Sequence, residues 1–188
     1  MLTTLIGVTG KAGSGKDTVG EMLWEEYGFV CSSFADPVKQ AASIIFGVEL
    51  DKFYDRVSKE AIDPYWGITR REMLTKLGTD ACRNVFGQDV WTKRWLMSFN
   101  EVNQFDDVVV TDVRFEDEAA LIRSMGGTII HLSRPASERG VKVDHVSEAG
   151  VKILDGDYGI DNNGTLGDLL KNVCFIVDDL ERRGKYRG

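Results

Sequence analysis

Five short apolar runs recur along the chain. They cover residues 5–9, 29–31, 108–111, 128–132 and, more weakly, 158–160. The runs are continuous rather than alternating, and most are rich in β-branched residues, which is typical of strands buried on both faces of a sheet. The pattern therefore predicts a five-stranded parallel sheet.

Helical patterns separate the runs. A helix is expected from about Lys16, and the last helix is the clearest because Thr165 and Asp168 form a capping-box pattern ahead of a regular apolar repeat that ends at Gly184. Strands that alternate with helices predict an α/β fold, a three-layer doubly wound sheet with right-handed crossovers.

Two segments do not fit a simple alternation. Residues from about 35 to 103 are helical in pattern but irregular, broken at Gly47, at residues 63–64 and at Gly67, and they are too long for one crossover. We interpret them as a substrate-binding insertion in a single domain, residues 1–188, whose core is 1–34 and 104–188. A charged segment at about 134–147 is expected to act as a lid.

Bulk composition narrows the class of protein. The 188 residues have near-average hydrophobic and charged content, and a net charge of −7 disfavours binding to a nucleic-acid polymer. The three cysteines are widely spaced, which argues against disulfides or a zinc site. No membrane span or targeting signal is visible, so a cytoplasmic location is expected.

The first strand leads directly into the motif Gly-Lys-Ala-Gly-Ser-Gly-Lys at residues 10–16. Its spacing matches a phosphate-binding loop (P-loop), in which glycines let consecutive backbone N–H groups face phosphate oxygens while a helix N-terminus and a lysine add positive potential. The residues expected to hold the phosphates are Gly10, Ala12, Gly13, Ser14, Gly15 and Lys16.

Acidic residues flank this loop. Asp17 stands where Ser or Thr is usual, with Thr18 next, and either could arrange Mg²⁺, which prefers hard oxygen ligands. Asp112 is expected directly after the third strand, where P-loop enzymes keep an acidic group for the metal, and Arg114 should point the same way. The structural alternative for Asp17 is that it only stabilises the first turn of the helix electrostatically. The alternative for Asp112 and Arg114 is a surface ion pair.

The stretch from Arg70 to Arg94 is locally basic, with six cations against three carboxylates. If it is helical, one face that could dock a monophosphate is shared by Arg71, Thr75, Thr79 and Arg83, and Gly78 would let the ligand approach the backbone. A tryptophan nearby could stack on a base or simply belong to the core. The residues concerned are Arg70, Arg71, Thr75, Gly78, Thr79, Arg83 and Trp91.

The lid supplies further cations. Arg134, Arg139 and Lys142 could reach a transferring phosphoryl group, where positive charge stabilises the transition state, or could be ordinary solvated charges. His145 is interpreted as a structural or hinge residue.

Together these motifs resemble the deoxynucleoside monophosphate kinases of tailed bacteriophages, within the nucleoside monophosphate (NMP) kinase-like P-loop NTPases. The resemblance covers most of the chain and rests on the order of five pieces: residues 10–18, 34–39, 77–80 with Arg83 and Trp91, 112–118 and 160–166. Thr75 departs from the family pattern, in which Gln is more usual.

The resemblance implies transfer of the ATP γ-phosphoryl group to a deoxynucleoside monophosphate (dNMP), with Mg²⁺ as cofactor. It implies that Lys16, Asp17, Arg114 and Arg134 serve catalysis. It places ATP on residues 10 and 12–18, Arg134, Asn163, Gly164 and Thr165, the dNMP on Lys39, Arg70, Arg71, Thr75, Gly78, Thr79, Arg83, Trp91 and Asp112, and the metal on Asp17, Thr18 and Asp112.

Two alternatives stay open at this level. One is another small-molecule P-loop kinase, such as a dephospho-coenzyme A or phosphomevalonate kinase, and the other is a regulatory module that binds ATP without transfer. The sequence does not decide the base, the sugar or the oligomeric state, and it allows a homodimer.

Overall fold

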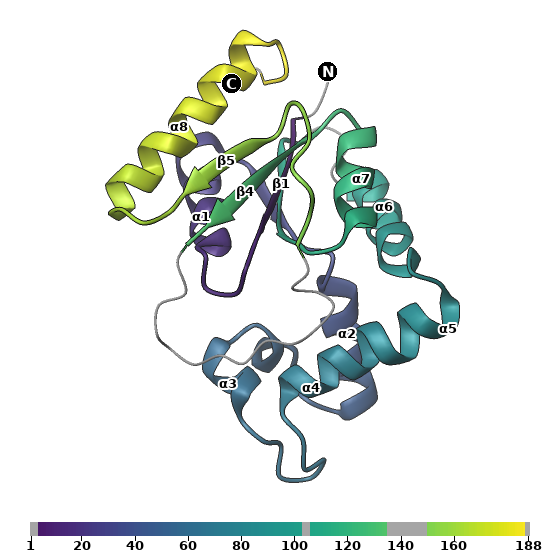
Figure 1. Ribbon diagram of the computed structural model, residues 1–188. Coiled ribbons are helices and arrows are strands. Elements are labelled where there is room, and N and C mark those ends of the chain that lie inside the picture. Colours follow the sequence, from purple (N-terminus) through teal and green to yellow (C-terminus); the bar gives the residue numbers. More distant parts are fainter. Residues whose placement is uncertain (1–3, 103–105, 135–149, 187–188) are drawn as a thin grey trace. The chain divides into compact units, whose positions relative to one another are not determined.

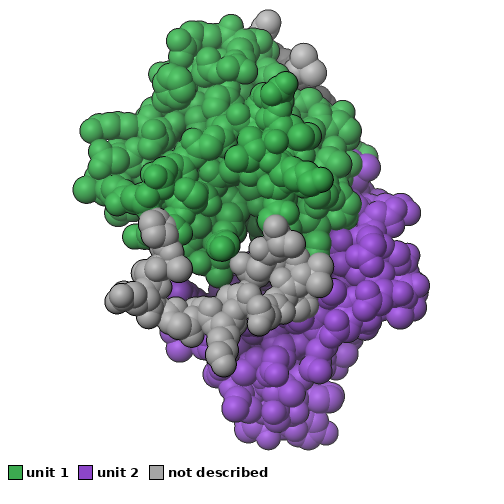
Figure 2. All heavy atoms as spheres, viewed as in Figure 1, with its two compact units in different colours: residues 1–33, 99–188 green, residues 34–98 purple. Residues whose placement is uncertain are grey.

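The computed structural model describes residues 4–102, 106–134 and 150–186 (Figure 1). These residues form two compact units, one made of residues 1–33 and 99–188 and the other of residues 34–98 (Figure 2). Among the described residues, no helix combines the length and the apolar character that crossing a bilayer requires.

The first unit is built on a five-stranded, wholly parallel sheet with strand order β2-β3-β1-β4-β5. This confirms the predicted fold class. The strands are β1 (Leu5–Gly10), β2 (Val30–Ser32), β3 (Val108–Val113), β4 (Thr128–Ser133) and β5 (Tyr158–Asp161).

Helices cover both faces of this sheet (Figure 1). On one face, α1 (Lys16–Tyr27) packs beside α8 (Leu166–Arg182), and their apolar side chains join those of the strands in one buried core. On the other face lies α7 (Glu116–Ser124), whose Ile122 comes so close to β1 that a Cβ on Gly7 would lie 2.7 Å from its Cδ1. Gly7 therefore lets α7 pack closely against the central strand.

The third strand contains an irregularity that was not predicted. Gly7 of β1 lies opposite Val110 of β3, but Thr9 lies opposite Val113, so β3 carries one extra residue in this stretch. Asp112 was expected to follow the strand, and that expectation is wrong, because Asp112 lies inside β3 within the irregular stretch. Bulges of this kind commonly turn a side chain toward a site.

The second unit is helical. It contains α2 (Asp36–Phe46), the 3₁₀ helix η1 (Leu50–Phe53), α3 (Arg56–Glu60), α4 (Arg70–Thr75), the π-helix η2 (Lys76–Arg83), α5 (Asn84–Phe86) and the start of α6 (Val90–Val102). Its small core centres on Ala42, Phe53 and Met73. The predicted breaks occur where expected, since α2 ends at Gly47 and Gly67 closes a turn onto the Asp63 carbonyl.

Candidate functional site

The loop between β1 and α1 has the backbone that a phosphate cradle needs. Gly10, Gly13 and Gly15 all have positive φ angles, of 151°, 77° and 105°, which other residues adopt only with strain. The Ser14 N–H donates to the Lys11 carbonyl at 3.1 Å and closes the turn. The loop thus curls directly into the N-terminus of α1, where backbone N–H groups are available to an anion.

Two polar side chains lie inside this loop. The Lys16 ammonium donates to the Gly10 carbonyl at 2.6 Å and to the Lys11 carbonyl at 3.0 Å, so its charge is held at the centre of the curl. The Ser14 hydroxyl is buried, with the residue only 2% exposed, and has no hydrogen-bond partner among the described residues. A buried hydroxyl in that state costs about 1–3 kcal/mol, which a phosphate oxygen would recover.

Two carboxylates of the first unit are candidates for a metal site, one near the end of β3 and one at the start of α1. Asp112 accepts a hydrogen bond from the Ser33 hydroxyl at 2.7 Å, which fixes one of its oxygens. Asp17 occupies the first turn of α1, followed by Thr18. Mg²⁺ is usually held by one or two carboxylates together with substrate phosphates, so the oxygen donors of Asp17, Thr18 and Asp112 suit this ion.

A pocket of about 330 Å³ opens beside the loop at the carboxyl ends of β1, β3 and β4. The structure brings the predicted Arg114 and Arg134 to this pocket together with Gly10 and Lys11. The described residues that line it are Thr9, Gly10, Lys11, Val113, Arg114, His131, Leu132, Ser133, Arg134, Gly150 and Val151. The predicted lid residues Arg139, Lys142 and His145 lie outside the described residues.

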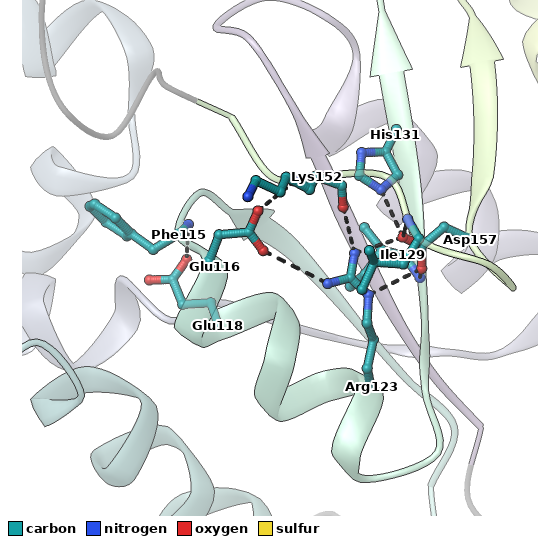
Figure 3. Close-up of polar contacts among 9 residues, drawn as sticks. Phe115, Glu116, Glu118, Arg123, Ile129, His131, Lys152 and Asp157 are labelled. Carbon is teal, nitrogen blue, oxygen red and sulfur yellow. Dashed lines mark hydrogen bonds and ion pairs between the residues drawn. The ribbon is translucent and has the colours of Figure 1, made fainter.

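One wall of this pocket is anchored by a buried carboxylate that sequence reasoning missed (Figure 3). The Asp157 side chain is 3% exposed and accepts hydrogen bonds from Arg123 at 2.6 and 3.3 Å, from the Leu154 N–H at 2.9 Å and from the Ile129 N–H at 3.3 Å. His131 Nε2 lies 3.1 Å from it. Asp157 therefore joins α7 and β4 to the segment that precedes β5.

Arg123, which pairs with Asp157, also contacts a residue next to the pocket. Arg123 donates to the Lys152 carbonyl at 2.9 Å, and the Lys152 N–H donates to Glu116 at 2.7 Å. Lys152 directly follows Gly150 and Val151, which line the pocket, so these bonds hold that wall against α7. No sequence motif marks Arg123 or Asp157, because they are 34 positions apart.

The pKa of Asp157 should shape stability in acid. Burial raises the pKa of this carboxyl, but hydrogen bonds from Arg123, Leu154 and His131 outweigh burial and hold the pKa below its ordinary value. A carboxyl with a lowered folded pKa stabilises the fold above its unfolded pKa of about 4, and that stability is lost as pH falls through the folded pKa. Asp157→Asn is therefore expected to lower the free energy of unfolding by about 1–3 kcal/mol at pH 7.

Urea unfolding of the parent and of Asp157→Asn between pH 7 and pH 3 checks this expectation. The difference between the two proteins should be constant above about pH 5 and should shrink below about pH 4. Asp155→Asn, an exposed change two residues away, is the matched control and should cost less than about 0.5 kcal/mol. A difference that stays constant down to pH 3 would contradict the assignment.

The turn that carries Arg114 is fixed by a second buried carboxylate. Glu118 is 3% exposed and accepts a hydrogen bond from the N–H group of Arg114 at 2.8 Å. It accepts a second from the Phe115 N–H at 3.1 Å (Figure 3). Its place at the third position of α7 is a sequence signal for a helix start, which could have identified this role. Glu118 thus positions the backbone from which the Arg114 side chain reaches the pocket.

The predicted adenine-side segment lies at the start of α8. Thr165 caps this helix and exchanges hydrogen bonds with Asp168, which confirms the predicted capping box. Gly164 packs against the same carboxylate, since a Cβ there would lie 2.9 Å from an Asp168 oxygen. Asn163 donates to Asp161. Their contact with ATP stays a prediction.

In the second unit, the four residues expected to share one face lie on two kinds of helix. Arg71 and Thr75 belong to α4, and Thr79 and Arg83 belong to the π-helix η2. Arg71 is about half exposed and pairs with Glu60 at 2.6 Å, whereas Arg83 is 3% exposed and donates to the Gln88 carbonyl. The two arginine side chains therefore differ in exposure, and a surface shared by the four residues stays a prediction.

The other predicted acceptor residues have structural partners within this unit. Trp91 is 9% exposed and its indole N–H donates to the Gly78 carbonyl at 2.8 Å, and a Cβ on Gly78 would lie 3.2 Å from Val38. Arg70 donates to Asp63 and to Ser58, and Lys39 pairs with Asp36 and covers the Tyr54 ring. Thr75 ends α4, and Thr79 lies within η2. Binding of a dNMP by these residues stays a prediction.

Comparison with known proteins gives the chain a family. A family model described as deoxynucleotide monophosphate kinase matches residues 48–173. The chain belongs to the deoxynucleotide monophosphate kinase family. The match covers more than half of the chain and confirms the resemblance inferred from the motifs.

Named relatives agree with this family, and a solved structure agrees with the fold. A protein of Acanthamoeba polyphaga mimivirus that carries the provisional name deoxynucleotide monophosphate kinase is 32% identical over 93% of this chain and 96% of its own length. The deoxynucleotide monophosphate kinase of Escherichia phage RB69 is 36% identical over 62% of this chain but only 47% of its own length. Dephospho-CoA kinase from Campylobacter jejuni, 15% identical, superimposes with a TM-score of 0.54 over 96% of this chain and 98% of its own, a likeness of fold alone.

Proposed function

We propose that this member of the deoxynucleotide monophosphate kinase family transfers the γ-phosphoryl group of ATP to a phosphate oxygen of a dNMP, giving a deoxynucleoside diphosphate and ADP. The observation that carries the proposal is the loop of residues 10–16, in which the Lys16 ammonium lies at the centre of a glycine curl that opens onto a helix N-terminus. A triphosphate tail meets both a full charge and aligned N–H groups there.

The transfer is a direct in-line displacement. An oxygen of the acceptor phosphate forms a new bond to the γ-phosphorus, the bond to the bridging oxygen breaks, and that oxygen leaves on ADP with the electron pair. The acceptor is already anionic, so no general base is required. Lys16 neutralises charge on the donor phosphates, and Arg114 and Arg134, which line the pocket beside the loop, stabilise charge that develops during transfer.

The metal role falls to Asp17, Thr18 and Asp112. These residues would hold Mg²⁺ beside the phosphates of ATP, where the ion would supply positive charge to the transferring group. The hydrogen bond from Ser33 orients the Asp112 carboxylate, so that one oxygen is already positioned.

The acceptor side belongs to residues of the second unit. Lys39, Arg70, Arg71, Thr75, Gly78, Thr79, Arg83 and Trp91 are proposed to bind the dNMP directly or to position those that do. The π-helix η2 supports this proposal, because such helices occur frequently at functional sites. We also propose that the protein acts in the cytoplasm and that it can form a homodimer. Both proposals rest on the sequence alone.

A coupled assay of ADP release, run with ribo- and deoxynucleoside monophosphates and with and without Mg²⁺, tests the proposed function. We expect ADP release only when a dNMP and Mg²⁺ are both present. Dephospho-coenzyme A is the control acceptor, because it is not a nucleoside monophosphate. It should give no release of ADP. ADP release that needs no acceptor, or that responds to dephospho-coenzyme A alone, would overturn the proposal.

A further inference from the structure

Asn162 makes a buried contact with the phosphate loop that none of the roles above uses. It follows the last residue of β5, and its own N–H donates to the Ser133 carbonyl of β4 at 2.8 Å. Its side-chain amide donates to the Ser14 carbonyl at 2.8 Å, a buried bond between residues 148 positions apart. The edge strand of the sheet is thus tied directly to the loop.

The bond determines which way one loop peptide faces. The Ser14 carbonyl and the Gly15 N–H belong to the same planar trans peptide, in which they point in opposite directions. When Asn162 holds the carbonyl on its own side, the Gly15 N–H is turned to the other side, away from Asn162. If this peptide were free to flip, its carbonyl oxygen would face the anion in a fraction of the protein molecules, and the oxygen would repel the anion.

The backbone of Gly15 gives independent evidence for the same contact. Its φ of 105° already favours glycine, and a Cβ built on it would lie 2.6 Å from the Asn162 side-chain nitrogen. The amide of Asn162 therefore packs directly against the Gly15 backbone. The loop geometry and the position of Asn162 depend on each other.

We infer that Asn162 is a positioning residue that orients the Ser14–Gly15 peptide so that the Gly15 N–H donates to the phosphate chain of the bound nucleotide. The inference rests on the proposed function, in which this loop holds ATP. It also joins the loop to the residues at the start of α8, because Asn162 immediately precedes Asn163, which is predicted to border the adenine.

Comparing nucleotide and nucleoside binding separates this role from general stability. Calorimetry on the full chain with ADP and with adenosine is carried out for the parent, Asn162→Asp and Asn162→Ala. Both variants should weaken ADP binding by about tenfold or more, since a hydrogen bond to a charged group is lost or misaligned. Adenosine has no phosphate, so its affinity should change less than about twofold.

Steady-state kinetics give a second readout. KM for ATP should rise in both variants while KM for the dNMP stays within about twofold of the parent. Asn172→Asp, the same chemical change at an exposed position of α8, is the matched control and should leave both values unchanged. A purely structural role would lower the melting temperature without changing the ratio of ADP to adenosine affinity.

These experiments distinguish a failure of the Asn162 inference from a failure of the proposed function. If the parent binds ADP and both folded variants bind it as tightly, the inference is wrong whether or not transfer occurs. If both variants fail to fold, Asn162 serves stability and the inference is also wrong. Absence of dNMP-dependent ADP release from the parent would instead remove the proposed function, and the loss of ADP affinity in the variants would still be measured.

Discussion

Replacing Lys16 by Met is expected to lower the turnover of acceptor-dependent ADP release by about 10³-fold or more while the protein stays folded. The Lys16 ammonium contacts two loop carbonyls at 2.6 and 3.0 Å, so it is the full positive charge at the centre of the cradle. Methionine keeps the length and apolar stem of the side chain but supplies no charge to the transferring phosphoryl group. The loss should therefore fall on turnover at saturating substrates.

The measurement is the coupled assay at saturating ATP and dNMP, accompanied by thermal unfolding. Lys171→Met is the matched control, because Lys171 is 81% exposed on α8 and should leave turnover unchanged. The melting temperature of Lys16→Met should remain within a few degrees of the parent, since a partly exposed lysine contributes little to stability. A folded Lys16→Met protein with near-normal turnover would show that catalysis does not depend on this loop.

The phosphate loop and the sheet were predictable because their physical determinants are local. Glycines at residues 10, 13 and 15 mark a positive-φ curl, continuous apolar runs mark buried parallel strands, and Thr165 with Asp168 marks a helix start. Even the weak run at 158–160 proved to be β5, which pairs with β4. In each case a few neighbouring residues carry the information.

The remainder of the site depends on contacts between residues far apart in the chain. Asn162 pairs with the Ser14 carbonyl, and Asp157 pairs with Arg123, only when strands and helices come together, so neither contact is marked in the sequence. Asp112 was expected after the end of β3 but lies inside the strand, in the stretch where β3 carries one extra residue. Sequence periodicity assumes regular strands and cannot reveal an extra residue within one of them.

The type of helix in the second unit was not predictable for a related reason. The expected face of residues 71, 75, 79 and 83 assumed 3.6 residues per turn, but residues 76–83 form a π-helix with a wider turn. Arg83 is buried whereas Arg71 is exposed, a difference that the charge pattern alone did not indicate. Propensity favours an ordinary helix here, so the irregular turn must be stabilised by packing, including the Trp91 bond to the Gly78 carbonyl.

Gly10→Ala should be the most damaging single-methyl addition in the loop, lowering the free energy of unfolding by about 2–5 kcal/mol. Gly10 has a φ of 151°, and a Cβ there would lie 2.5 Å from the Leu132 carbonyl oxygen and 2.7 Å from the Ser14 hydroxyl oxygen. Leu132 belongs to β4 and pairs with Gly10 in the sheet, so its backbone cannot retreat without breaking strand pairing. ADP affinity should fall with stability, because relieving the clash requires the loop to move.

Gly13→Ala provides the matched control. Gly13 also has a positive φ, of 77°, but a Cβ there would meet nothing within 4 Å, so only the conformational strain of about 1–2 kcal/mol remains. Urea unfolding of the two variants beside the parent therefore separates the clash from the strain. If Gly10→Ala and Gly13→Ala lose the same stability, the close approach of β4 to the start of the loop does not constrain the loop.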